Sequence, residues 1–324
     1  MNGDSARERF EPSGLPGDAI VYADALLEGP VPADVTDAEM QAIRERFWAD
    51  AAPQQGRPST AESLLARWQR GMESFPDYDE VVLWFEHDLF DQLLLIRHLD
   101  WFARRGLGPT RLSLVCVGEF AGIETFLGLG QLTPAQLASL FGTRAAVTAE
   151  QFDLGRRAWQ AFTSSDPTRI EPLIASDTGA LPFLAPALRR WLEEFPAMDN
   201  GLPRSEAQIL SRLDERARSL DRLFDEWMRH EEVLVPTDTS LASRLDAMAA
   251  GPRPLVYVQR QIGNGRNALK GTAARTDIGR DVAAGRADWI ALAPFDRWLG
   301  GVHVTNDAMW RWDAAQGRLR KTSS

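Results

Sequence analysis

The stretch VVLWFEHDLFDQLLL, residues 81–95, runs five apolar residues into the ionisable triplet EHD and then returns to apolar side chains. Its first part is rich in β-branched and aromatic residues, which is typical of a buried strand. Residues 89–105 have helical spacing, and RLSLVCV at 111–117 predicts a second strand close behind that helix. Strands that alternate with helices predict a parallel sheet with helices on both faces.

Other elements of the first half are predicted from residue spacing and from capping residues. AIVYA at 19–23 has the composition of a short buried strand. One helix should begin at Thr36, where Glu39 completes a capping box, and another at Thr133, which is followed by Pro134. The pattern then becomes helical. Further helices are predicted over residues 59–73, 151–162, 166–175 and 185–195.

A change of pattern near Gly201 and Pro203 marks the predicted domain boundary, with an α/β domain at 1–199 and a second domain at 200–324. The second domain carries three short amphipathic helices and then two strands joined by a turn, the order of a winged helix-turn-helix. Its end predicts β-hairpins with turns at Asn306-Asp307 and Gln316-Gly317. These elements span residues 205–213, 219–231, 240–250, 254–261, 262–267, 268–276 and 302–320. The predicted fold class is α/β, with an open parallel sheet and flanking helices, then a helical segment and a winged-helix-like α+β domain.

The composition is that of a soluble globular protein: 324 residues, 44% hydrophobic and 25% charged. No run approaches the roughly 18 apolar residues of a membrane helix, and the first residues, MNGDSARERFEPSG, lack the features of a secretory signal. The single cysteine, Cys116, excludes an internal disulfide and a cysteine-rich zinc site. Its apolar surroundings are typical of a buried, inert thiol. The prediction is a cytoplasmic protein with no membrane partner.

The charge is unevenly distributed. Residues 1–199 hold 17 basic and 30 acidic side chains, a net charge of −13, whereas residues 200–324 hold 19 and 16, a net charge of +3. The acidic half should repel nucleic acid, and the second half need not. Arginine supplies 34 of the 36 basic residues, which leaves Lys270 and Lys321. Lysine-nucleophile chemistry therefore has almost no candidate residues.

Polar side chains follow the predicted strands at their carboxyl ends, where open parallel sheets bind ligands. If the strands are neighbours, several carboxylates, an imidazole and a serine meet at one edge of the sheet. The predicted catalytic residues are Asp4, Ser5, Glu86, His87 and Asp88, and the predicted substrate-binding residues are Asp24, Glu28, Asp91 and Gln92.

A purely structural interpretation covers part of this group. Asp88 is a good N-cap for the helix that begins at Leu89, and Asp91 then lies in the first turn, where the helix dipole favours a carboxylate. That interpretation leaves Glu86 and His87 unexplained. An imidazole beside carboxylates suits general acid-base catalysis or a metal ion.

Two glycine-bearing stretches have open interpretations. LGLGQL, residues 127–132, precedes a helix and predicts a turn, with a phosphate site as the weaker alternative. DRWLGGVH, residues 296–303, is either a tight bend that needs positive φ or a segment that reaches across to the first domain.

The predicted wing is basic. Residues 251–286 carry seven basic and two acidic side chains, a net charge of +5, which is compatible with phosphate contacts. The predicted recognition helix has Arg244 as its only long basic side chain, flanked by Asp238 and Asp246, so base reading from it would be poor. DNA binding and protein binding are equally favoured.

Six blocks of the chain carry a family resemblance: NGDSA, EGPVP, WFEHDLFDQL, GLGQLTPAQLASLF, DTGALPFL and NGLPRSEAQIL. In this order they resemble the bacterial family known as domain of unknown function 1835. The resemblance spans most of residues 2–215, and it implies an α/β N-terminal domain and no known activity. Related chains carry an apolar strand before NGDS, whereas Met1 directly precedes Asn2 here, through strand loss or a misplaced start. The positions that match the family are Asp4, Ser5, Glu28, Glu86, His87, Asp88 and Gln92.

The leading functional prediction is a hydrolase or group-transfer enzyme that acts on a small polar substrate. The acidity of the cluster favours a divalent metal ion, and His87 would be a general base or a metal ligand. A serine hydrolase resembling the GDS type is a weaker alternative, because its Asp-x-x-His partner is not clearly present. The rival prediction is a regulator, with an acidic sensor domain and a winged helix that binds DNA or a protein.

Overall fold

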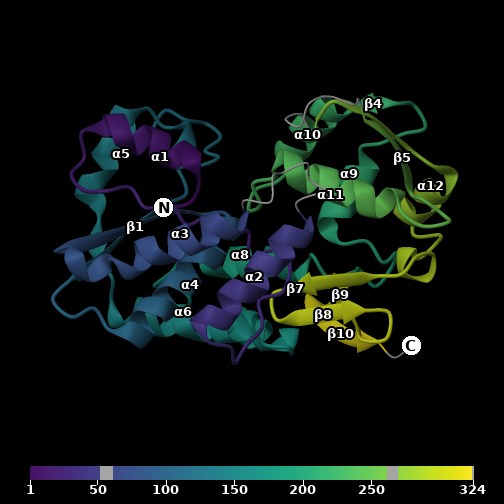
Figure 1. Cartoon of the computed structure of the whole chain (residues 1–324). Coiled ribbons are helices and arrows are strands. Elements are labelled where there is room, and N and C mark those ends of the chain that lie inside the picture. The colour runs from purple at the N-terminus through teal and green to yellow at the C-terminus, as the bar shows by residue number, and fades with distance from the viewer. Residues whose placement is uncertain (52–60, 261–268, 323–324) are drawn as a thin grey trace.

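The computed structural model describes residues 1–51, 61–260 and 269–322 and shows a mixed α/β protein with four small sheets (Figure 1). Within those ranges, no helix combines the length and the apolar character that crossing a membrane requires.

The strand–helix–strand unit predicted from the opening stretch is confirmed. β1 (Glu80–Glu86) pairs in parallel with β2 (Arg111–Val117), and α4 (Leu89–Arg105) connects them. The two-residue β3 (Ala145–Ala146) adds an antiparallel edge to β2. Because side chains alternate across a strand, Leu83 and Phe85 enter one hydrophobic cluster and Trp84 enters another.

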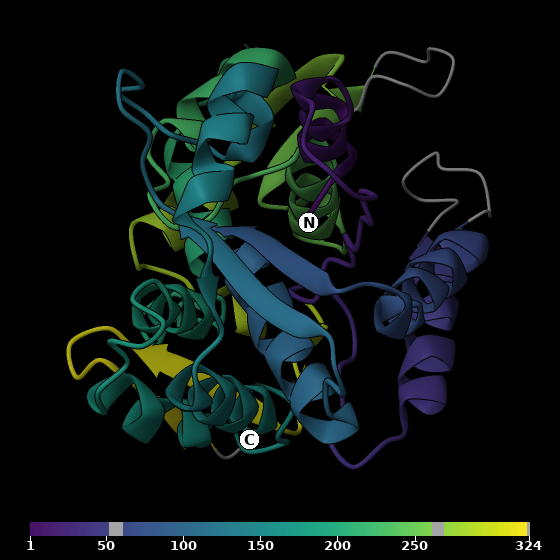
Figure 2. The ribbon, with the colours of Figure 1, turned by 90° about the vertical axis from the view of Figure 1, so that its left-hand side faces the viewer.

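Helices cover both faces of this sheet. α1 (Asp4–Phe10) and α5 (Pro134–Leu140) lie on the side of Trp84, while α4 and α6 (Ala149–Phe162) lie on the opposite side (Figures 1 and 2). α4 is buried along most of its length, which places its first turn inside the protein.

The strand predicted over residues 19–23 is wrong, because this segment forms no strand. Its backbone instead pairs with Met1: the N–H of Tyr22 donates to the carbonyl of Met1 at 3.0 Å, and the Met1 amine donates to the carbonyl of Ile20 at 3.0 Å. In the described part of the chain, β1 pairs only with β2. The predicted open parallel sheet is therefore reduced to one parallel pair.

The capping box predicted at Thr36 and the helix start predicted at Thr133 are confirmed. Thr36 accepts from the N–H of Glu39 at 3.2 Å, and the Glu39 carboxylate accepts from the N–H of Thr36 at 2.8 Å. Thr133 and Gln136 form the same arrangement at α5. Two residues of the helix predicted over 59–73 lie outside the described ranges. The remaining helices of this half are α2 (Asp37–Ala51), α3 (Ala61–Glu73), α7 (Ile170–Ala175) and α8 (Leu184–Leu192).

The second half has the winged-helix order. Its three-stranded sheet has the strand order β4-β6-β5, and the predicted turn at 262–267 lies outside the described residues. A short helix not predicted from the sequence, α12, follows the sheet. The elements are α9 (Arg204–Ser211), β4 (Arg218–Ser219), α10 (Leu220–Met228), α11 (Asp238–Ala249), β5 (Val256–Arg260), β6 (Gly271–Arg275) and α12 (Asp277–Ala283).

Two hairpins end the described chain: β7 (Asp296–Leu299) with β8 (Val302–Thr305), and β9 (Met309–Asp313) with β10 (Arg318–Thr322). The turn predicted at Gln316-Gly317 joins β9 to β10, whereas Asn306-Asp307 is spanned only by an isolated bridge. These hairpins lie against the first half of the chain (Figure 1). The N–H of Met198 donates to the carbonyl of Trp312 at 2.9 Å, and the N–H of Leu319 donates to Glu171 at 2.7 Å.

DRWLGGVH, residues 296–303, forms a bend with positive φ and also contacts the first half of the chain. Gly300 has a φ of +58°, and its carbonyl accepts a hydrogen bond from the N–H of Val31 at 2.9 Å. Gly301 packs so closely that a Cβ there would lie 1.7 Å from the carbonyl oxygen of Thr163. As a result, one cluster of buried apolar side chains extends from Tyr22 to Leu319 and crosses the predicted boundary.

Candidate acidic metal site

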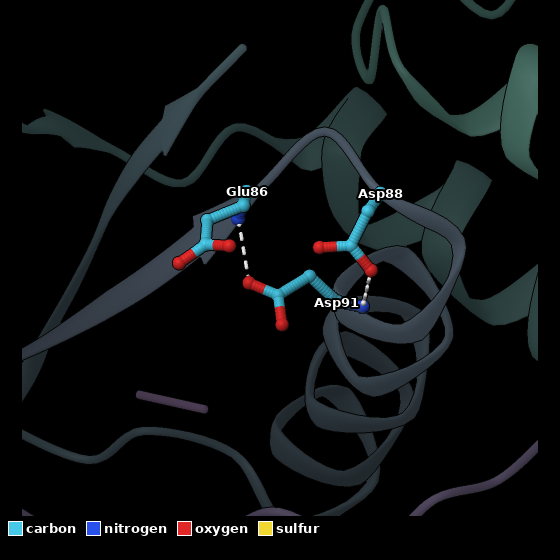
Figure 3. A group of neighbouring side chains, drawn as sticks. All are labelled: Glu86, Asp88 and Asp91. Atoms are coloured by element: carbon cyan, nitrogen blue, oxygen red, sulfur yellow. Dashed lines mark hydrogen bonds between the residues drawn. The ribbon is translucent and has the colours of Figure 1, made fainter. Parts of the chain in front are cut away.

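Three carboxylates meet where β1 ends and α4 begins. Glu86 is the last residue of β1, Asp88 precedes the helix, and Asp91 lies in its first turn. One oxygen from each lies within 4.8 Å of the others (Figure 3). Asp88 and Asp91 are buried and Glu86 is half-buried. We call these three residues the acidic cluster.

Backbone N–H groups hold the acidic cluster in place. Asp88 is the N-cap of α4, as predicted, and accepts from the N–H groups of Phe90 at 2.8 Å and Asp91 at 3.2 Å. Asp91 accepts from the N–H of Glu86 at 2.7 Å, and Glu86 accepts from the N–H of Leu129 at 2.6 Å. The capping role of Asp88 and Asp91 therefore coexists with their place in the cluster.

The electrostatics of the cluster are unfavourable without a counter-charge. Among the described residues, none of its carboxylates forms an ion pair. Burial, with the neighbouring Asp88, raises the pKa of Glu86 to about 8, and burial raises the pKa of Asp88 to about 6. Burial and both neighbours raise the pKa of Asp91 well above its ordinary value. The cluster must therefore either retain protons or bind a cation.

Gln92 and Cys116 lie beside the cluster. The side-chain amide of Gln92 donates to the carbonyl of Glu86 at 2.6 Å and approaches the Cys116 sulfur at 3.4 Å. These contacts give Gln92 a positioning role on the backbone that carries Glu86. Burial raises the pKa of the Cys116 thiol to about 12, which agrees with the predicted inert thiol.

His87 belongs to a different environment. Its ring lies between Phe126, at 6.3 Å between centroids, and Phe183, at 6.1 Å. Its Nδ1 atom is buried and has no hydrogen-bond partner among the described residues. Burial lowers the pKa of His87, so the imidazole is neutral near pH 7. The described geometry groups the three carboxylates without His87.

The N-terminal segment reaches the cluster through a residue that the sequence reasoning missed. Asn2 donates a short hydrogen bond from its side-chain amide to Asp91. Asp4 is instead exposed and pairs with Arg7 at 3.1 Å. Ser5 is also exposed, and its Cβ lies 2.9 Å from the position of a Cβ added to Gly130. Asn2 lies in the same NGDS stretch as the predicted residues Asp4 and Ser5, and this position could have indicated it.

The loop at 127–132, for which the sequence predicts a turn, contacts Glu86 of the acidic cluster. Residues Leu129–Gln131 form a short 3-10 helix, preceded by Gly128 with a φ of +141°. A Cβ on Gly128 would lie 2.1 Å from Oε2 of Glu86. The absence of a side chain at this position therefore makes room for the Glu86 carboxylate.

Asp24 and Glu28 make other contacts. Asp24 is buried and accepts hydrogen bonds from Arg44 at 2.6 and 2.9 Å and from the Trp48 indole at 2.8 Å. Burial alone would raise the pKa of Asp24, but these partners outweigh it and hold the pKa below its usual range. Glu28 lines a cavity of about 330 Å³ together with Arg244. No hydrogen bond or ion pair among the described residues joins either carboxylate to the acidic cluster.

The predicted recognition helix, α11, uses its basic side chain internally. Arg244 is buried and pairs with Glu206 at 3.0 Å and Glu194 at 2.8 Å. Asp246 on the exposed face binds Arg260 of β5 at 2.9 Å. This arrangement leaves no unpaired arginine or lysine on α11.

No protein-family model matches the chain, and no curated protein matches it either. The resemblance to domain of unknown function 1835 therefore stays a prediction.

Proposed function

We propose that the acidic cluster binds a divalent cation and that the protein is a hydrolase or group-transfer enzyme acting on a small polar substrate. The observation that carries this proposal is the meeting of three carboxylates that form no ion pair in the described ranges. The lone cysteine fits a cytoplasmic location, where thiols stay reduced.

The chemistry of the donor set supports a hard cation. Carboxylate oxygens are the ligands that Mg²⁺, Ca²⁺ and Mn²⁺ prefer. A buried charged carboxylate without an ion pair is costly, and a divalent cation would offset that cost for several carboxylates at once. Such a cation lowers the pKa of bound water and stabilises charge that develops on a substrate. His87, held neutral by burial, has the protonation state that a general base requires.

Calorimetric titration with Mn²⁺ and Mg²⁺, together with metal analysis of the purified protein, tests the site. The wild-type chain should bind one of these ions saturably, and Glu86→Gln and Asp91→Asn should lose that binding. Glu119→Gln, which changes an exposed carboxylate just beyond β2, is the matched control and should bind as the wild type does. If the wild type binds neither ion, or if both cluster variants bind normally, the proposal fails.

A second function, partner binding through the winged helix, is favoured by the strand order β4-β6-β5 and by the helices α9, α10 and α11, which come before β5 in the chain. The internal use of Arg244 favours a protein partner over DNA. A fluorescence anisotropy titration with duplex DNA at low and moderate salt distinguishes the two. Binding that falls steeply with salt would support the DNA version, and no binding at low salt would exclude it.

A further inference from the structure

A cavity of about 560 Å³ lies between the 32–37 loop, one face of α4 and the end of α6. We call it the α4–α6 cavity. Arg97, Asp100, Trp101 and Arg104 are spaced three and four residues apart, so they share the face of α4 that lines it. Its volume is within the range of small-molecule sites. Its lining residues include no member of the acidic cluster, so it is independent of the proposed metal site.

Arg97 is the unusual member of this lining. It is only 7% exposed, yet it donates no hydrogen bond to any described residue. Its closest carboxylate oxygen is on Asp24, at 3.8 Å, and that carboxylate already accepts three hydrogen bonds from Arg44 and Trp48. The guanidinium group also lies 4.5 Å from the centroid of the Tyr22 ring. A buried guanidinium with unused N–H donors is costly unless a ligand or water accepts from it.

A second guanidinium group lies in the same lining. Arg169 is exposed and forms no ion pair within the described ranges. The lining therefore presents two guanidinium groups, those of Arg97 and Arg169, that donate no hydrogen bond to a described residue.

The acidic residues of the lining form no hydrogen bond or ion pair with Arg97 or Arg169. Asp37 and Asp100 are bound by Arg104 at 3.0 and 2.8 Å, and Asp37 also binds Arg105 at 2.9 Å. Asp34 is exposed, with a left-handed φ of +57°, and forms no ion pair in the described part of the chain. The buried part of the cavity therefore favours an anion.

We propose that the α4–α6 cavity binds a small organic dianion, a phosphomonoester or a dicarboxylate, through Arg97 and Arg169. A guanidinium group matches the geometry of both oxyanions with paired N–H donors. The cavity is larger than an oxyanion alone, and the half-buried Trp159 in its lining supplies apolar surface for the rest of the ligand.

Calorimetric titration of the full chain with inorganic phosphate and, separately, with succinate tests this proposal and distinguishes the two oxyanions. Either anion should bind saturably at concentrations up to about 10 mM, which would nearly saturate a site with a Kd of about 1 mM. Arg169→Ala and Arg97→Gln should each weaken that binding by about tenfold to a hundredfold. Arg156→Ala is the matched control, because Arg156 is an exposed arginine of α6 outside the lining.

Arg97 is buried, so circular dichroism must first show that Arg97→Gln is folded. Arg169 is exposed, and its variant tests the site even if Arg97→Gln does not fold. The proposal is overturned if the wild type binds neither anion over this concentration range. It is equally overturned if Arg169→Ala binds as tightly as the Arg156→Ala control.

Discussion

The backbone N–H of Glu86 donates a 2.7 Å hydrogen bond to the carboxylate of Asp91, five residues further along the chain. This bond ties the end of β1 to the first turn of α4 and holds two acidic side chains close together. The same carboxylate also accepts from Asn2. These contacts of the backbone and of Asn2 therefore set the geometry of the acidic cluster.

We expect the titration of Glu86 to lower the free energy of unfolding as the pH rises from about 4.5 towards about 8. The pKa of Glu86 is 4.5 in the ordinary state and about 8 in the folded protein, so the folded state holds a proton that the unfolded state has lost. Raising the pH therefore favours unfolding, by on the order of a few kcal/mol. Urea denaturation at a series of pH values measures this, and Glu86→Gln should flatten the profile.

The buried ion pairs act in a different pH range. The pKa values of Asp24 and Glu194 are lowered by their arginine partners, so their contribution is lost only under more acidic conditions. Burial lowers the pKa of His98 to about 3 and that of the Met1 amine to about 6, and these two groups make stability rise with pH in the same window. The difference between the wild type and Glu86→Gln therefore isolates Glu86, and identical pH profiles for the two metal-free proteins would contradict the prediction.

A divalent cation should offset this loss of stability. Mn²⁺ competes with protons for the carboxylates, so its stabilising effect should be larger at pH 8 than at pH 5. At a hundredfold excess over the Kd, the expected gain is about 2.7 kcal/mol. Thermal denaturation with Mn²⁺, and again after chelation by EDTA, gives the difference. An equal shift at both pH values would argue against carboxylate ligands.

Gly128→Ala should displace Glu86 from the acidic cluster. A Cβ at this position would lie 2.1 Å from the Glu86 carboxylate, so the loop or the side chain must move. We expect a loss of about 1–3 kcal/mol in stability and a loss of Mn²⁺ binding. Gly122→Ala is the control, because Gly122 also has a positive φ but no neighbour within 4 Å of an added Cβ. Equal Mn²⁺ affinity in the two variants would contradict the steric argument.

Arg190→Met should destabilise the protein by about 3–5 kcal/mol, because it leaves the buried carboxylate of Glu231 without an ion pair and leaves Glu194 with Arg244 alone. Arg190 binds Glu194 at 2.6 Å and Glu231 at 2.7 Å, and these three side chains are almost fully buried. Chemical denaturation measures the change. Arg204→Ala breaks an ion pair whose arginine is 38% exposed, and it should cost less than about 1 kcal/mol. Similar losses for the two variants would contradict this assignment.

Gly301→Ala should weaken the contact between the β7–β8 hairpin and α6. A Cβ at Gly301 would lie 1.7 Å from the carbonyl oxygen of Thr163, and backbone cannot yield as a flexible side chain does. We expect a loss of about 2–4 kcal/mol, measured by thermal and urea denaturation. Gly142→Ala, where an added Cβ has no neighbour within 4 Å, should be nearly neutral.

The sequence predicted the local elements well, because their signals are local. The strand–helix–strand unit follows from residue spacing, and the capping boxes at Thr36 and Thr133 follow from side chains three residues apart. The strand at 19–23 failed because a strand depends on a partner elsewhere in the chain. Among the described residues, the backbone of that segment pairs with Met1 and with no strand.

The candidate site was predicted in part for the same reason. Glu86, Asp88 and Asp91 are close in sequence, so a strand end and a helix start bring them together. Asp24 also follows a predicted strand, but in the structure it accepts a hydrogen bond from Arg44 on α2, twenty residues further along the chain. Asn2 and Gly128 reach the cluster through tertiary contacts that residue spacing does not encode.

The contact between Gly301 and Thr163 links the β7–β8 hairpin to the α4–α6 cavity. Thr163 lines the α4–α6 cavity on one side and supports the β7–β8 hairpin on the other. A ligand in that cavity would restrict the motion of Thr163, against which the β7–β8 hairpin packs. Amide hydrogen exchange in β7 and β8 would then slow when the cavity is filled, although neither strand lines the cavity.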